Sequence, residues 1–185
     1  MMKYMIAPAL AAGAFSAPAF AQNDPAPFSG PRVEAVAGTD GDLTYGGGLG
    51  YDLQSGKIVF GVEGEVLLSN SRDCETLMSN IQDRLCVKGG RDLYMGGRIG
   101  FVLGAGTLLY GKAGYSNLRL KETYDPGTSA GTTFEGARTL DGIRVGGGIE
   151  QTIGRSAFLK GEYRYSNYEG GSRKHDAIIG LGLRF

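Results

Sequence analysis

The chain ends in Asp176-Ala177-Ile178-Ile179-Gly180-Leu181-Gly182-Leu183-Arg184-Phe185. Every second residue of this stretch is apolar, namely Ala177, Ile179, Leu181, Leu183 and Phe185. The other parity holds the small or charged residues Gly180, Gly182 and Arg184. Because successive side chains of a strand point to opposite faces, the stretch predicts a strand with one apolar face. A strand of this kind is what the wall of a β-barrel in lipid requires.

The start of the chain has the pattern of an exported protein. Lys3 gives a positive charge, Ile6–Phe20 is apolar or small, and Ala19-Phe20-Ala21 fits a cleavage site. We therefore expect residues 1–21 to be a signal peptide, cleaved between Ala21 and Gln22. A membrane anchor is the alternative, but the apolar run is short and interrupted by proline, and no stop-transfer pattern follows. Residues 22–31 predict a flexible leader.

Composition narrows the class of protein. Lys plus Arg and Asp plus Glu both number 19, so net charge favours neither nucleic acid nor acidic lipid as a partner. Glycine, at 33 of 185 residues, is spread through the apolar stretches. No stretch after the leader reaches the roughly 18 uncharged apolar residues of a spanning helix, so membrane crossing would depend on strands. The length after residue 31 fits one domain, over 32–185.

Eight segments of alternating character follow the leader, over 32–39, 43–53, 58–67, 92–103, 108–120, 141–150, 157–168 and 176–185. Short turns at 54–57, 104–107 and 151–156 alternate with longer polar connections at 68–91, 121–140 and 169–175; the first connection, 40–42, is short. This alternation is typical of transmembrane barrels. We expect an all-β fold, an eight-stranded antiparallel up-and-down transmembrane β-barrel with both termini on the periplasmic rim.

Nearly every charge in these segments falls on the parity opposite to the apolar residues. The set has six acids and six bases: Glu34, Asp52, Glu63, Glu65, Glu150, Glu162, Arg98, Lys112, Arg144, Lys160, Arg164 and Arg184. Charges inside a narrow barrel are costly unless they are paired, and these can pair almost completely. We therefore expect a charge network that plugs the lumen, with Arg98, Arg144 and Arg164 facing Glu63, Glu65 and Glu162 near mid-strand.

Alternation alone does not say which face meets water, because a soluble lipocalin-like barrel has the same pattern turned inside out. The charged parity is also rich in glycine, as at Gly46, Gly48 and Gly146, and only a crowded interior has a reason to lack side chains. Tyrosines on the apolar parity near strand ends suit a membrane interface: Tyr45, Tyr51, Tyr115, Tyr163 and Tyr165. Both features favour the membrane barrel.

Two local features interrupt the pattern. Near Asn117 the apolar residues change face, with Leu118 and Leu120 on the charged parity, which predicts a bulge or a strand end. Cys74 and Cys86 are the only cysteines and would form a disulfide in an oxidising compartment. Between them, apolar residues at 77, 78, 81 and 85 predict a short helix over 73–85 that begins at Asp73. Its expected role is a lid, or contact with a host surface, a neighbouring protein or lipopolysaccharide.

Three stretches carry a resemblance to a known family: Leu109–Tyr115, Lys160–Ser166 and Gly180–Phe185. They resemble the small eight-stranded outer-membrane β-barrel proteins of Gram-negative bacteria, the OmpA-like and opacity-type superfamily, especially its alphaproteobacterial immunogenic members. The resemblance covers the whole mature chain and implies residence in the outer membrane. It also implies that the outer-membrane assembly machinery reads Phe185 as a sorting signal. Unlike full-length OmpA, the chain has no peptidoglycan-binding domain, and the cysteine loop is not a general feature of the family.

Function is predicted less sharply than fold. A structural or surface-interaction role in the envelope is the first hypothesis, with lipid or lipopolysaccharide, host proteins and envelope proteins as candidate partners. A narrow porin-like channel for ions or small solutes is the second. A lipid-modifying enzyme at the rim is the third, and it would have to use His175 with Ser172. A lone histidine in a loop does not predict catalysis, so we expect no enzyme, no cofactor and no metal site.

Overall fold

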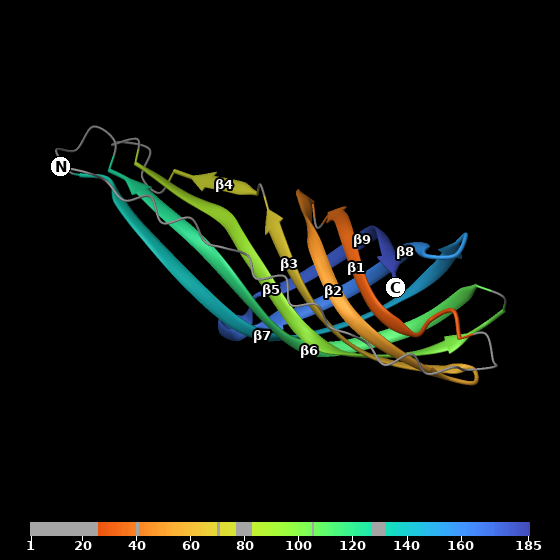
Figure 1. Cartoon of the computed structure of the whole chain (residues 1–185). Helices are drawn as coiled ribbons and strands as arrows, with labels where there is room; N and C mark the ends of the chain where they lie inside the picture. The colour runs from red at the N-terminus through yellow and green to blue at the C-terminus, as the bar shows by residue number, and fades with distance from the viewer. Residues whose placement is uncertain (1–25, 40, 70, 77–82, 105, 127–131) are drawn as a thin grey trace, which may run out of the picture.

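Figure 1 shows the computed structural model of the protein, which describes residues 26–39, 41–69, 71–76, 83–104, 106–126 and 132–185. The described elements are strands and a single 3-10 turn, Glu169–Gly171. The strands are β1 Gly30–Thr39, β2 Leu43–Ser55, β3 Ile58–Ser69, β4 Arg72–Glu75, β5 Arg84–Val102, β6 Thr107–Asp125, β7 Phe134–Ile153, β8 Ala157–Tyr168 and β9 Arg173–Arg184. No described helix has the length and hydropathy to cross a membrane. The expected signal peptide and its cleavage at Ala21 lie outside the described residues.

The sheet closes into a ring of eight antiparallel strands. Neighbours pair in the order β3-β2-β1-β9-β8-β7-β6-β5, and β3 pairs with β5 to complete the circle. The first strand meets the last along Arg32–Thr39, where Val36 lies opposite Gly180. The prediction of an eight-stranded antiparallel up-and-down barrel is therefore confirmed. β4 lies outside the ring and pairs only with the start of β5.

The two rims of the barrel differ. The short connections β2–β3, β5–β6 and β7–β8 gather on one rim, together with the C-terminus, on the right in Figure 1. On the other side β5, β6 and β7 have 19, 19 and 20 residues, whereas β1 has 10 and β3 has 12. A tilted spanning strand needs about 9–11 residues, so β5, β6 and β7 each exceed that length by roughly eight residues, or about 26 Å measured along the strand. β4 lies along this extension (Figure 1).

The prediction of a helix over 73–85 is wrong at both ends of that segment, which the structure describes as strands. Asp73–Glu75 belongs to β4 and Arg84–Leu85 to β5; residues 77–82 lie outside the described residues. Cys74 lies directly opposite Cys86 in the β4–β5 ladder, and the expected disulfide joins them. The apolar spacing that suggested a helix therefore spans two paired strands and the connection between them.

The irregularity expected near Asn117 lies on the neighbouring strand. β6 continues through Leu118 and Leu120 to Asp125 and stays in register with β7. The β5–β6 ladder slips between Gly89 and Asp92, where two residues of β5 oppose Arg119, as in a β-bulge. Leu118 and Leu120 do lie on the interior parity, because β6 continues its regular alternation from Lys112 and Ser116.

The part of the expected leader (22–31) that the structure describes is ordered rather than a flexible leader. Gly30 and Pro31 already belong to β1, and Phe28 is fully buried at the short-turn rim. The Phe28 amide donates to Gln54 Oε1 at 3.0 Å, and the ring packs against Val59, Leu108 and Tyr110. The aromatic side chain therefore closes the short-turn end of the lumen from within.

Burial decides which face is outside. Most large hydrophobic residues of the apolar parity are exposed, from 42% for Tyr45 to 72% for Phe185, whereas Arg144 and Arg164 are 0% exposed. A soluble barrel would bury the apolar set. The structure instead places a continuous apolar band on the outer wall, and Tyr45, Tyr51, Tyr115 and Tyr163 lie in this band. This arrangement is that of a membrane barrel with a polar interior.

Candidate functional site

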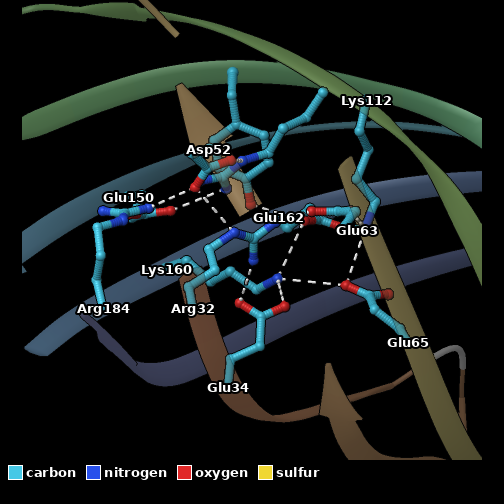
Figure 2. Close-up of polar contacts among 12 residues, drawn as sticks. Arg32, Glu34, Asp52, Glu63, Glu65, Lys112, Glu150, Lys160, Glu162 and Arg184 are labelled. Carbon is cyan, nitrogen blue, oxygen red and sulfur yellow. Dashed lines mark hydrogen bonds and ion pairs between the residues drawn. The ribbon is translucent and has the colours of Figure 1, made fainter. Parts of the chain in front are cut away.

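The charged side chains of the inner face fill the lumen and form its most distinctive chemistry. All the residues expected there are buried, from β1 around the ring to β9. Figure 2 labels part of this set, whose side chains converge from opposite walls with ion pairs that cross the interior. Three additional inner charges were missed by the sequence analysis although they share the parity: Arg32, Asp92 and Asp176.

The network has a cluster at the short-turn end, centred on Asp52. Its carboxylate accepts hydrogen bonds from Arg32 Nε at 3.1 Å, Arg98 Nη2 at 2.6 Å and Arg184 Nη2 at 2.8 Å. Glu150 accepts from the same Arg98 at 3.0 Å and pairs with Arg184 at 2.8 Å. This cluster therefore forms a layer of ion pairs that connects β1, β2, β5, β7 and β9.

A second cluster lies at mid-barrel. Lys112 Nζ contacts Glu63 at 2.7 Å, Glu65 at 3.1 Å and Glu162 at 2.9 Å. On the other side Lys160 Nζ reaches Glu34 at 2.6 Å, and longer contacts link it to Glu65 and Glu162 at 3.5 and 3.6 Å (Figure 2). Both lysines therefore share carboxylates, and the cluster joins β1, β3, β6 and β8.

Two arginines extend this middle cluster in opposite directions. Arg164 Nη2 donates to Glu65 at 2.8 Å, and its Nε donates to Glu162. Arg32 donates to Glu34 at 3.1 Å and to Glu63, which connects the middle cluster to Asp52 below it. The charges of the lumen thus form one connected network through the two lower layers.

A third cluster lies toward the long-strand rim. Arg144 donates to Asp92, to Ser166 Oγ at 2.7 Å and to Tyr168 Oη at 2.8 Å. Ser116 Oγ donates to Asp92 at 3.0 Å and lies 3.0 Å from Tyr168 Oη. Neutral hydroxyls therefore contact this arginine and its carboxylate where few other charges are near, although Arg144 Nη1 is buried without a hydrogen-bond partner.

Aromatic side chains complete the packing between these layers. The Arg98 guanidinium lies over the Tyr110 ring at 5.0 Å, and Lys112 Nζ lies over the Tyr94 ring at 4.5 Å. The Tyr110 hydroxyl donates to Glu162 at 2.7 Å. The lumen therefore combines cation–π contacts with ion pairs, and the aliphatic stems and rings occupy space that water would otherwise fill.

Glycines on the inner face leave room for these long side chains. A Cβ at Gly146 would lie 3.4 Å from Lys112 Cγ and 3.5 Å from Arg164 Cγ. At Gly48 it would lie 3.0 Å from both Glu34 Oε1 and Glu65 Cγ. A Cβ at Gly48 would therefore press on the network, whereas at Gly146 the stems of Lys112 and Arg164 bound the space left for a larger side chain. This is the crowding that the glycine-rich charged parity indicates.

Partner assignment from sequence was only partly right. Arg164 contacts Glu65 and Glu162 as expected, but Arg98 pairs with Asp52 and Glu150, and Arg144 pairs with Asp92. Parity gives the face of a residue, whereas the stagger of tilted strands sets its height along the barrel axis. Arg98 therefore lies below, and Arg144 above, the carboxylates proposed for them.

His175, the candidate for rim chemistry, lies on the outer wall. Its Nδ1 is 2.7 Å from the Tyr163 hydroxyl, and its ring is tilted against Tyr165 with centroids 4.9 Å apart. Ser172 follows the 3-10 turn and accepts a backbone hydrogen bond from Tyr168. The imidazole is thus engaged by tyrosines of the interfacial band, and no contact with Ser172 is recorded among the described residues.

Comparison with known proteins agrees with this architecture. The family model for the "Outer membrane protein beta-barrel domain" matches residues 7–185. A "22 kDa outer membrane protein" of Rhizobium leguminosarum bv. viciae is 27% identical over 158 residues, which cover 77% of this chain and 68% of that protein.

Solved structures show the same fold at low identity. The N-terminal β-barrel domain of Pseudomonas aeruginosa OprF superposes with a TM-score of 0.57 at 15% identity, over 85% of this chain and 98% of that one. Ail, the attachment invasion locus protein of Yersinia pestis, solved with the heparin analogue sucrose octasulfate, gives 0.53 at 13% identity, over 85% and 99%. At these identities the likeness concerns the fold alone.

Proposed function

This chain belongs to the outer-membrane protein β-barrel family, and on that premise we propose that it is a sealed structural and surface-interaction protein of the cell envelope. The observation that carries the proposal is the ion-pair network that crosses the lumen. Its members come from every part of the ring and leave charged groups facing one another across the interior. A conducting pore would need these side chains to separate.

Electrostatics supports a plug over a channel. A charge inside the barrel that loses its partner costs about 3–5 kcal/mol, since it is left buried without compensation. Arg32, Glu65 and Glu162 each have several partners, so a moving side chain would break more than one contact. Phe28 adds an apolar stopper at the periplasmic end.

The surface-interaction part of the proposal concerns the extension of β5, β6 and β7. This sheet carries β4 and the Cys74–Cys86 disulfide beyond the membrane band. Binding residues are found disproportionately on segments that a rigid scaffold holds above a surface. We therefore place contact with host or envelope proteins on this extension rather than on the short first connection at 40–42.

Two residues outside the lumen enter the proposal differently. Phe185 is 72% exposed at the periplasmic rim, and its amide donates to the Pro31 carbonyl at 2.9 Å, so its side chain is accessible to an assembly factor. His175 is given no catalytic role, because the groups recorded around it are tyrosines. Lipid processing that survives His175→Ala in cells would agree with that assignment.

Conductance tests the sealed lumen. The refolded chain, added to planar bilayers, should give no steady conductance steps. Glu34→Ala combined with Lys160→Ala removes a 2.6 Å ion pair without changing net charge, and it should produce measurable openings. Lys57→Ala in the exposed turn between β2 and β3 is the matched control. Steady conductance by the unmodified chain would favour the porin-like channel instead.

Envelope function needs a cellular measurement. A strain that lacks the protein should become more sensitive to detergent, and the unmodified chain should restore resistance. The Glu34→Ala, Lys160→Ala variant should restore it less well if a sealed lumen matters. Normal resistance in the deletion strain would remove the structural role and leave surface interaction as the part still to be tested.

A further inference from the structure

The outer wall carries a groove of about 920 Å³ where β1, β2, β3, β5 and β6 pass side by side. Two rows of laterally paired residues line this groove. Val33, Leu49, Gly64, Met95 and Tyr115 lie in one row of paired residues, and Ala35, Gly47, Val66, Leu93 and Asn117 lie in the next row toward the long-strand rim. All these positions share the outward parity, so the groove opens to the membrane.

Two glycines make the floor of this groove. Gly64 lies between Leu49 and Met95 in its row, and Gly47 lies next to Val66 in the row above. Leu49 and Met95 are 67% and 71% exposed, so their side chains rise as walls beside positions that have none. The result is an apolar trough in the part of the wall that faces hydrocarbon. We call it the lipid-side groove.

Cations gather on the same outward face directly above the groove. Arg91 lies opposite Leu68, and Arg119 lies beside the bulge of β5. One row farther from the membrane, Arg72, Lys88 and Lys121 are directly opposite one another on β4, β5 and β6. Two residues along a strand span about 7 Å, so this cationic patch lies about 7–14 Å above Leu93 and Asn117.

The cationic patch lowers the stability of the protein when no anion is bound, because three of its cations lie directly opposite one another. Like charges directly opposite each other in a sheet are destabilising. All five side chains of the cationic patch are exposed, and none is recorded in an ion pair with another described residue. The nearest acids on this face are Glu135, beyond the patch on β7, and Asp141, whose carboxylate accepts hydrogen bonds from Tyr115 and Asn117. The arrangement therefore suits an anion supplied from outside the chain.

We propose that the lipid-side groove and the cationic patch together form a binding site for a phosphate-bearing lipid of the surrounding outer leaflet. One acyl chain lies over Gly64 and Gly47 between Leu49 and Met95, and the phosphates contact Arg91, Arg119 and the lysines above. An apolar trough that continues into a group of cations matches an amphiphile with an anionic head and nothing smaller. This site goes beyond the proposed envelope role, because its ligand belongs to the membrane itself.

Lipid retention by the full mature chain tests the site. The protein in neutral detergent is mixed with bis-phosphorylated lipid A, and native mass spectrometry measures the bound fraction. Gly64→Leu fills the trough, and the barrel should accept it because the atom nearest to a Cβ there is the Tyr94 carbonyl oxygen at 3.7 Å. We expect Gly64→Leu to weaken binding about tenfold, since the acyl chain loses its place. Lys88→Gln with Lys121→Gln should weaken it about thirtyfold.

Matched controls separate the site from general effects. Gly161→Leu adds the same side chain to the outer wall on β8, where a Cβ meets no atom within 4 Å. Lys57→Gln with Arg155→Gln removes the same charge from two exposed periplasmic turns. Both controls should bind lipid A like the unmodified chain. Every variant must also keep the mobility difference between boiled and unboiled samples on an SDS gel, which reports a closed barrel.

Three outcomes would overturn the proposal. Equal retention of lipid A and phosphatidylcholine would show that the cationic patch does not select for an anionic headgroup. Weaker lipid A binding by the lysine variant but not by Gly64→Leu would show that the cations contact the headgroup while the groove does not bind an acyl chain. Binding of sucrose octasulfate that competes with lipid A and ignores Gly64→Leu would assign the patch to soluble polyanions. None of these results depends on whether the lumen conducts, so the sealed-lumen proposal stands or falls separately.

Discussion

At the scale of single residues, Asp52 shows how the lumen is held together. It lies on β2, yet its carboxylate accepts hydrogen bonds from arginines of β1, β5 and β9, two of them from strands more than 40 residues away in sequence. The side chains of this contact set are nearly inaccessible to water. Because three arginines share this one acid, its loss removes an ion-pair partner from each of them at once and leaves the periphery of the cluster with excess positive charge.

Asp52→Asn should therefore lower the free energy of unfolding by about 3–5 kcal/mol, although it changes only one oxygen to nitrogen. The exposed Asp73→Asn on β4 is the matched control and should change it by less than about 0.5 kcal/mol. Urea unfolding of the refolded chain in lipid vesicles, followed by circular dichroism since the chain has no tryptophan, measures both. Equal stability of the two variants would contradict a network centred on Asp52.

Residue parity was sufficient to place the lumen charges on the inner face, but not to choose their partners. Glu34 and Arg32 share one parity, and only the first was expected in the lumen, because Arg32 begins the predicted segment. Arg98 meets Asp52 rather than Glu63 because neighbouring strands are staggered. A period of two residues carries no information about height along the barrel, so partner choice required the register of every strand pair.

At the scale of elements, the strands within the membrane were predictable and their extensions were not. β1, β8 and β9 lie close to their expected bounds, because lipid outside and charges inside impose strict alternation. β5 begins at Arg84 instead of 92 and β6 continues to Asp125 instead of 120. Above the membrane both faces of these strands meet water, so the alternation that reveals a strand is lost and Lys121-Glu122-Thr123 reads as a loop.

The disulfide should stabilise one element and not the barrel. Cys74→Ser with Cys86→Ser releases β4, which pairs with β5 alone, and the closed loop is worth about 3 kcal/mol in the chain-entropy model. Trypsin in detergent micelles should then cut at Arg72 and Arg84 about a hundredfold faster, through local opening of this segment.

An internal control accompanies this digestion. Arg155 lies in the turn between β7 and β8, at the opposite rim, and its cleavage should be unchanged by loss of the disulfide. The mobility difference between boiled and unboiled samples should also persist. Faster cleavage at all three arginines would mean that the disulfide supports the whole barrel, against the topology that leaves β4 outside the ring.

At the scale of the whole molecule, closure depends on one seam between the ends of the chain. β1 pairs with β9 from Arg32↔Arg184 to Thr39↔Ala177, and no strand edge is left open within the ring. A closed barrel has no frayed edge from which detergent can unravel it. The global fold was predictable because eight alternating segments and unequal connections admit few other arrangements, whereas the uneven height of the rim was not.

The unboiled chain should therefore migrate differently from the boiled chain on an SDS gel. A chain shortened by removal of 173–185 loses β9 and the seam, so it should show one mobility with or without boiling. Gel electrophoresis of both forms after refolding in detergent provides the measurement. A single band position for the full chain under both conditions would argue against a closed ring.

The ion pairs of the lumen also constrain the order in which the molecule is made. Lys160 bonds to Glu34 across 126 positions of sequence, and Arg184 bonds to Asp52 across 132. An unfinished chain that entered the bilayer strand by strand would carry bare charges into hydrocarbon, at a cost of several kcal/mol each. We therefore expect insertion to be favourable only once the last strand has arrived, so that the lumen charges disfavour the insertion of truncated barrels.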